Sequence, residues 1–281
     1  QVESHDASQV IFREFCRRII MRQIFKNTKT IALLTITLIG CGKGLPLVPL
    51  GTNQADKYLF ERATEEIEDR NWQDARIYFQ QIVDNYPQSL LRPDAKLGIG
   101  DTYLGEDNSQ SLVMAVNEYR EFLSFYPTSA RADYAQYKIG MTHYAQMEVP
   151  ERDQTETRAA LQEFNVFFDN YPNSKLTQEV RSKWREARDH LSESSYLVGV
   201  FYFRKEWYPG AIPRFREVLE KDPDYSKIDA VYYHLAESLF QTDKPAEAIP
   251  YFNNLITEFP NSEYLEEAKN RFDLLTNSNN H

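Results

Sequence analysis

One residue of this chain lies in a context that predicts a covalent reaction, and that residue is Cys41. It ends the run Leu38-Ile39-Gly40-Cys41, in which two apolar residues and a small residue precede the cysteine. A charged segment beginning at Met21 and the apolar run 31–39 come before it, in the order of a lipoprotein signal peptide. We therefore expect cleavage before Cys41, transfer of a diacylglyceryl group to its thiol and N-acylation of the new amino terminus.

The signal divides the N-terminal part of the chain into three segments. Residues 1–20 precede the first methionine and are expected to be an upstream extension outside the mature protein. Residues 21–40 are the predicted signal peptide, whose apolar run rises only about 14 Å as a helix, against about 30 Å for the hydrocarbon core of a bilayer. Residues 41–54 are expected to be the lipidated cysteine and a flexible tether, because Gly and Pro are frequent there.

The lipid would hold the protein at a membrane surface, because two or more acyl chains give stable anchoring. Gly42 follows the cysteine, where an aspartate would resemble the inner-membrane retention signal, so delivery to the outer membrane is expected. The alternative is a free or disulfide-bonded Cys41. If translation starts at Met21, the second cysteine, Cys16, is not made, and no disulfide can form within the mature chain.

The remaining titratable residues do not predict catalysis, and apart from the lipid no cofactor or metal is expected. The histidines after Met21 have neither a second histidine at helical spacing nor a nearby cysteine, as a metal site would need; they are His143, His190, His234 and His281. The sequence has no Gly-rich phosphate loop and no Gly-x-Ser-x-Gly motif. Its formal net charge is −10 and its basic residues are dispersed, so nucleic acid is not an expected partner.

The elements that position the remaining residues are predicted from an internal repeat. Ala-x-x-x-(Phe/Tyr), followed by Pro eight residues after the aromatic, occurs five times. The copies are Ala75, Phe79 and Pro87; Ala115, Tyr119 and Pro127; Ala160, Phe164 and Pro172; Ala211, Phe215 and Pro223; Ala248, Phe252 and Pro260. A small residue precedes each copy, at Ala63, Gly100, Gly140, Gly199 and Ala236.

This pattern resembles the tetratricopeptide repeat, a helix-turn-helix unit in which small residues let two helices approach and proline ends the second helix. We predict an all-α fold, an α-α superhelix of five such repeats closed by a C-terminal capping helix at 263–275. Repeats one to three occupy 55–173, and repeats four and five with the capping helix occupy 174–281. A serine after each repeat proline is expected to cap the next helix; these are Ser89, Ser129, Ser174, Ser226 and Ser262.

In this repeat type the first helix of each unit lines a concave groove, which predicts a set of peptide-binding residues. The set has apolar or aromatic side chains at or next to groove-facing positions of repeats one to three: Phe60, Leu97, Tyr103, Tyr134, Tyr137, Met141 and Tyr144. Asp101 is also at such a position. An extended or aromatic-ended peptide would fit these residues, and the alternative is that the aromatics only pack helices together.

Two further segments interrupt the regular spacing. An insertion of about 146–157 in repeat three contains Arg152 and Asp153. Its polar residues predict either a surface loop with no binding role or a contact with a partner. Before repeat four the first helix is expected to be long, from Lys175 to Lys205.

The lipid signal, the short tether, five repeats, an insertion with Arg-Asp-Gln in the third and a long helix before the fourth together resemble the BamD family of β-barrel assembly lipoproteins. The resemblance implies a periplasm-facing outer-membrane lipoprotein of a Gram-negative bacterium that helps insert β-barrel proteins. It implies that the N-terminal repeats bind unfolded outer-membrane proteins and that the C-terminal repeats bind a POTRA domain of the barrel assembly subunit. Accessory assembly lipoproteins are further implied partners. Arg214 is at the family's partner-facing arginine position, although the adjacent Pro213 departs from the family pattern.

Two other functions are compatible with a repeat scaffold. A coordinator of the Tol-Pal and cell-wall machinery has similar repeats, but it lacks a lipidation motif and begins with a coiled coil. An envelope enzyme, or the regulator of one, acting in peptidoglycan turnover is the third possibility.

Overall fold

Helices make up nearly all of the chain that the structure, a computed structural model, describes, which is residues 48–49 and 53–278. The predicted upstream extension, signal peptide and Cys41 lie outside the described residues, as does most of the tether. The helices fall in one compact unit that begins at residue 51. The predicted division into residues 55–173 and 174–281 is therefore a division within this unit.

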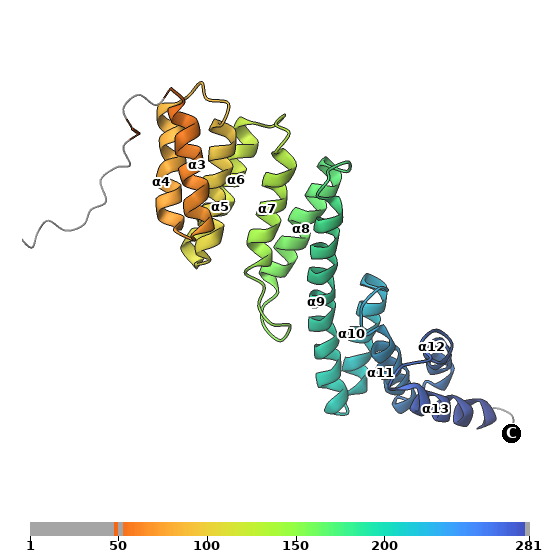
Figure 1. Cartoon of the computed structure of the whole chain (residues 1–281). Coiled ribbons are helices and arrows are strands. Elements are labelled where there is room, and N and C mark those ends of the chain that lie inside the picture. The colour runs from red at the N-terminus through yellow and green to blue at the C-terminus, as the bar shows by residue number, and fades with distance from the viewer. Residues whose placement is uncertain (1–47, 50–52, 279–281) are drawn as a thin grey trace, which may run out of the picture. The chain divides into compact units, whose positions relative to one another are not determined.

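Eleven helices follow one another in the described residues, and each repeat supplies a first helix (A) and a second helix (B) (Figure 1). The pairs are α3 (Ala55–Glu68) with α4 (Trp72–Asn85), α5 (Arg92–Glu106) with α6 (Ser109–Phe125), α7 (Ala132–Tyr144) with α8 (Thr155–Asn170), α9 (Thr177–Arg204) with α10 (Tyr208–Lys221), and α11 (Ile228–Gln241) with α12 (Pro245–Glu258). Helix α13 (Leu265–Ser278) closes the series. The predicted all-α repeat fold is confirmed.

The repeat motif forms the contact between the A and B helices. In repeat three, a Cβ atom on Gly140 of α7 would lie only 2.4 Å from Cε1 of the Phe164 ring on α8. Gly199 of α9 meets the ring of Phe215 on α10 in the same way, at 2.5 Å. Both rings are fully buried. The absence of a side chain on the A helix therefore sets how closely the aromatic of the B helix approaches.

Short turns join the A and B helices of repeats one, two, four and five. Each turn contains one non-glycine residue in the left-handed region, Arg70 with φ 60°, Asp107 with φ 48°, Glu206 with φ 58° and Asp243 with φ 58°. This conformation reverses the chain within a few residues, although it is unfavourable for a side chain with a Cβ. Packing of the two helices must outweigh that local strain.

The prediction that the serines cap the following helices is wrong. In four of the five turns the serine hydroxyl accepts the amide of the residue two positions later, as Ser89 does from Leu91 at 3.1 Å, and this amide precedes the helix. Ser226 instead donates its hydroxyl to Asp189, at 2.6 Å. A Ser-turn competes with a helix cap because the same hydroxyl oxygen serves either amide.

Helix α9 is long, as predicted, and it packs against α8, α10 and α11. Its C-terminal half belongs to the largest buried cluster, which continues through α10, α11 and α12 to Ala268 and Leu275 of α13. Helices α10 and α12 continue through Pro213 and Pro250. Because proline lacks an amide hydrogen, each of these helices has one backbone hydrogen bond fewer.

Candidate functional site

One face of α7 carries three of the seven predicted peptide-binding residues. Tyr134, Met141 and Tyr144 are half-buried there, at positions seven and three residues apart, so they lie along one side of the helix. Lys138 lies between them. We call these four residues the α7 face.

The Asp101 carboxylate of α5 holds the first tyrosine of the α7 face. The Tyr134 hydroxyl donates to Asp101 Oδ2 at 2.8 Å, and the buried Tyr119 of α6 donates to Oδ1 at 2.6 Å. Lys138 Nζ lies 3.7 Å from the same carboxylate. Burial raises the pKa of Tyr134, and the neighbouring Asp101 charge raises it further. The phenol therefore stays neutral and remains a donor.

Two carboxylates of α9 hold the other tyrosines of α7. The hydroxyl of Tyr137 donates to Glu179 Oε1 at 2.8 Å, and that of Tyr144 donates to Glu186 Oε2 at 2.5 Å. Lys183 pairs with Glu186 at 2.9 Å and lies 5.0 Å from the centre of the Tyr144 ring. Neither glutamate was predicted. The signal was available, because two tyrosines seven residues apart face two glutamates seven residues apart on the next A helix.

Two of the predicted groove residues are buried, so the prediction that they line a peptide-binding groove is wrong. The side chain of Leu97 is 2% exposed and packs among core residues of α6 and α7. The Tyr137 side chain is 6% exposed, with its ring 6.4 Å from the ring of Phe164. Neighbouring side chains cover these two residues and leave them no surface for a peptide.

The remaining two predicted groove residues are half-buried in inter-helix contacts. The ring of Phe60 lies 5.4 Å from the repeat aromatic Phe79, edge to face. The guanidinium of Arg76, on α4, stacks 3.6 Å from the centre of the Tyr103 ring. Part of each ring is therefore used in packing, and a role in peptide binding stays a prediction for both.

The predicted partner contacts Arg152 and Asp153 lie on the exposed loop that joins α7 to α8. Arg152 pairs with Glu148 at 3.4 Å, and Asp153 accepts the backbone amide of Thr155 at 2.9 Å, where α8 begins. Hydrogen bonds with Thr155 lower the pKa of Asp153. This carboxylate therefore fixes the entry to α8 in addition to any contact it makes outside the chain.

Gln154, which sequence reasoning missed, gives the loop its shape. Its side chain is 3% exposed and donates to the carbonyl oxygen of Val149 at 2.9 Å and to that of Arg152 at 3.2 Å. It also accepts a hydrogen bond from Thr157 at 2.7 Å. A buried amide with all of these partners makes the loop a defined structure.

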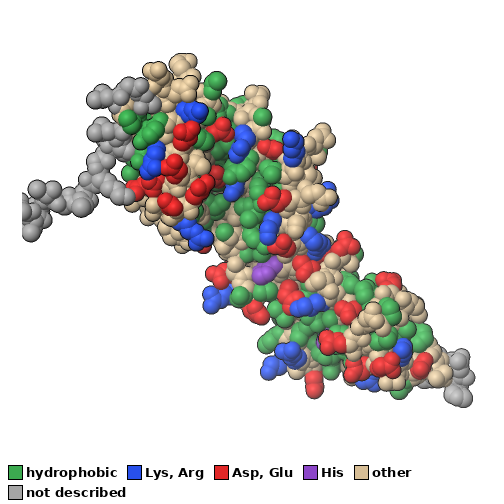
Figure 2. Space-filling view, in the orientation of Figure 1, with side chains coloured by type: hydrophobic (Ala, Val, Ile, Leu, Met, Phe, Trp, Pro, Cys, Tyr) green, Lys and Arg blue, Asp and Glu red, His purple; other side chains and the backbone are tan. Residues whose placement is uncertain are grey.

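The predicted contact Arg214 is exposed on α10. Its guanidinium pairs only loosely with Glu217, at 3.5 Å, one turn later on the same helix. Over the visible face of the molecule in Figure 2, Lys and Arg side chains are interspersed with Asp and Glu. Arg214 is thus available for a further carboxylate.

The histidines that the structure describes have close partners within the fold. His143 Nδ1 lies 2.7 Å from Glu156, at the two ends of the α7–α8 loop. The buried His234 has Nδ1 2.7 Å from the Ala230 carbonyl oxygen, and desolvation lowers its pKa. Within residues 48–49 and 53–278, no three His, Cys, Asp or Glu side chains come together as a metal site.

Comparison with known proteins identifies relatives over most of the chain. The family model described as "YfiO: Outer membrane lipoprotein" matches residues 52–238, and a tetratricopeptide repeat model matches residues 230–262. "Outer membrane protein assembly factor BamD" of Caulobacter vibrioides is 24% identical over 224 residues, which cover 78% of this chain and 72% of the relative. The protein of the same name from Rickettsia prowazekii is 26% identical over 215 residues, covering 76% and 79%.

Among solved structures, the "TPR2AB-domain:pHSP90-complex of yeast Sti1" aligns with a TM-score of 0.43 and 13% identity. The alignment covers 79% of this chain and 83% of that one.

Proposed function

The chain belongs to the YfiO (BamD) family of outer membrane lipoproteins, and we propose that it is a non-catalytic scaffold subunit of the complex that assembles outer-membrane β-barrel proteins. The proposal has three parts, which concern a peptide-binding face, a docking edge and a lipid anchor. Each part has its own experiment.

The peptide-binding part rests on the α7 face, which is the observation that carries the proposal. Tyr134 and Tyr144 are held by carboxylates on both neighbouring A helices, so their rings are ordered before any ligand arrives. Preordered aromatic rings bind with less loss of side-chain entropy. We expect this face to bind the aromatic-ended targeting segment of an unfolded outer-membrane protein.

A fluorescent peptide with a C-terminal aromatic residue tests this part by anisotropy titration. Tyr144→Ala should weaken binding by about tenfold, the loss of one aromatic contact. Phe125→Ala removes an aromatic side chain that is 65% exposed on α6 and serves as the matched control. Equal affinity of wild type and Tyr144→Ala would remove the α7 face from the proposal.

The docking part assigns Arg214, with Arg152 and Asp153 of the α7–α8 loop, to contact with a POTRA domain of the barrel assembly subunit. All three side chains are exposed. Affinity purification from detergent-extracted membranes should recover the barrel subunit together with accessory lipoproteins. Recovery of unrelated proteins alone would contradict this part.

The anchoring part assigns the lipid to Cys41 and the protein to the periplasmic face of the outer membrane. No described helix is long and apolar enough to cross a membrane. Mass spectrometry of the N-terminal peptide from extracted membranes should give a triacylated Cys41, whereas an intact Met21 or Gln1 would contradict the assignment.

A further inference from the structure

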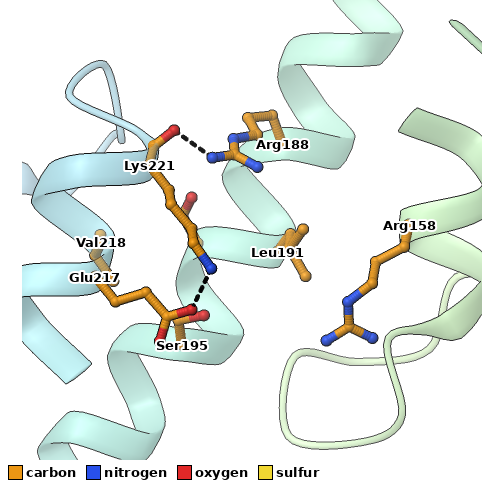
Figure 3. Close-up of a pocket in the computed structure, with 8 residues that line it drawn as sticks. Arg158, Arg188, Leu191, Ser195, Glu217, Val218 and Lys221 are labelled. Carbon is orange, nitrogen blue, oxygen red and sulfur yellow. Dashed lines mark hydrogen bonds and ion pairs between the residues drawn. The ribbon is translucent and has the colours of Figure 1, made fainter. Parts of the chain in front are cut away.

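A cavity of about 100 Å³ lies between α8, α9 and α10, and its wall is rich in cations (Figure 3). Arg158 of α8, Arg188 of α9 and Lys221 of α10 line it, together with one carboxylate, Glu217. The chain as a whole has a formal charge of −10. The lining of the cavity thus has more cations than carboxylates, although Arg188 also lies 4.0 Å from the buried Asp222 carboxylate.

Two of the three cations are held by partners within the wall. Arg188 donates from Nη2 to the backbone carbonyl oxygen of Lys221, near the C-terminal end of α10, and Lys221 Nζ donates to Glu217 Oε1 at 2.6 Å. Both interactions are drawn in Figure 3. These contacts keep the two cations at the cavity.

Arg158 differs from the other two. No hydrogen bond or ion pair joins its guanidinium to any residue that the structure describes, apart from a longer-range attraction to Asp153. In Figure 3 its side chain extends from α8 toward the α9 side of the cavity without an interaction to the other labelled residues. A guanidinium has five donors in a planar fork, which matches the two oxygens of a carboxylate.

The cavity lies between the two segments that carry the predicted partner contacts. Arg158 is in the first turn of α8, directly after the loop with Arg152 and Asp153. On the other side, the cavity residue Glu217 pairs with Arg214 at 3.5 Å. The cavity therefore adjoins the α7–α8 loop through Arg158 and adjoins Arg214 through Glu217.

We propose that this cavity binds an aspartate or glutamate side chain of the polypeptide that docks on α10, with the carboxylate on Arg158. The proposal rests on the docking function proposed above and adds a second contact to the one at Arg214. Leu191 and Val218 give the wall an apolar part, which suits the methylene groups of an acidic side chain better than a hydrated phosphate.

The test uses the full-length protein and the periplasmic part of the barrel assembly subunit, with affinities measured by calorimetry. Arg158→Glu should weaken binding by about 10- to 100-fold, because it places like charges together in a partly enclosed site. Arg158→Lys should weaken it less, since the positive charge remains without the fork. Lys175→Glu changes net charge equally at an exposed turn residue away from the cavity, and should alter affinity less than about twofold.

The outcomes separate this proposal from the docking function. If wild type does not bind the barrel subunit, the docking function fails. If wild type binds and Arg158→Glu binds equally well, the cavity proposal fails alone. The cavity proposal would also be overturned if Arg158→Glu bound the barrel subunit as well as wild type does but no longer bound vesicles of anionic phospholipid. The cavity would then be a phosphate site. Restoration of Arg158→Glu binding by an acidic-to-lysine change in the partner would support it.

Discussion

Arg185 of α9 and Asp222 at the end of α10 form a bidentate ion pair. Both guanidinium nitrogens of Arg185 donate to the two carboxylate oxygens, Nη1 at 2.8 Å and Nη2 at 2.5 Å. The Asp222 side chain is 3% exposed and also accepts the Ser192 hydroxyl, at 2.6 Å. This pair fixes the long helix α9 against the C-terminal end of α10, next to the cationic cavity.

Asp222→Asn should lower the free energy of unfolding by about 2 to 4 kcal/mol at neutral pH, because a buried charge pair loses one member. Burial alone would raise the pKa of Asp222, but the bonds from Arg185 and Ser192 lower it below 3.8. The stabilisation is therefore present above the unfolded pKa and is lost as the pH falls through the folded value. Urea unfolding should show the difference between wild type and Asp222→Asn shrinking below about pH 4.

The exposed Asp224 provides the control for this measurement. Asp224→Asn should change stability by less than about 0.5 kcal/mol. A gap between wild type and Asp222→Asn that persists unchanged into acid would contradict the assigned pKa direction.

Gly140→Ala should lower the free energy of unfolding by about 1 to 3 kcal/mol. Alanine is a better helix former by up to about 1 kcal/mol, but overpacking a buried ring costs more. The new Cβ would lie 2.4 Å from the Phe164 ring, which is fully buried. Denaturant unfolding of Gly140→Ala, Phe164→Leu and the double variant should give a double-mutant cycle in which the second change partly rescues the first. Additive losses would argue against the contact.

Spectrophotometric titration at alkaline pH should show two classes of tyrosine. Burial raises the pKa of Tyr137 and Tyr225 above the ordinary value of 10.0, and the carboxylates of Glu179 and Glu193 raise it further. Because the folded pKa is raised, the stabilisation is present below the unfolded pKa and is lost as the pH rises through the folded value. Tyrosines in urea should ionise in a single phase near pH 10, while the folded protein retains a protonated class until it unfolds.

Tyr137→Phe should remove one tyrosine from that protonated class and lower stability by about 1 kcal/mol, the typical contribution of one hydrogen bond. If all tyrosines of the folded wild type titrate together near pH 10, the hydrogen-bonded arrangement of α7 is wrong.

Arg214→Ala should abolish copurification of the barrel assembly subunit without changing stability measurably. Its pair with Glu217 is half exposed, and such pairs contribute at most about 1 kcal/mol. Arg216 is the matched control, since it lies two residues further along α10, is similarly exposed and also has one glutamate partner, Glu247. Loss of the subunit from both variants alike would indicate a general charge effect instead of a contact at Arg214.

Much of the fold could be predicted because the residues of the repeat motif determine local helix packing and helix ends. A small residue, an aromatic and a proline at constant spacing define two helices and the turn after them, so the helix pairs and the long α9 follow from the sequence. The predicted capping helix at 263–275 corresponds to α13, at Leu265–Ser278. The serine caps were predicted incorrectly because one hydroxyl can accept either of two nearby amides, and local sequence does not decide between them.

The binding surfaces were less predictable, because side-chain partners come from distant parts of the chain. The sequence placed Tyr134, Tyr144 and Leu97 on A-helix faces, but only the packing of α5, α6, α7 and α9 decided that carboxylates hold the tyrosines and that Leu97 is covered. Likewise, no spacing or motif in the sequence groups Arg158 with Lys221. Burial and ion pairing depend on distances between helices, which the stacking of repeats sets and a single repeat does not contain.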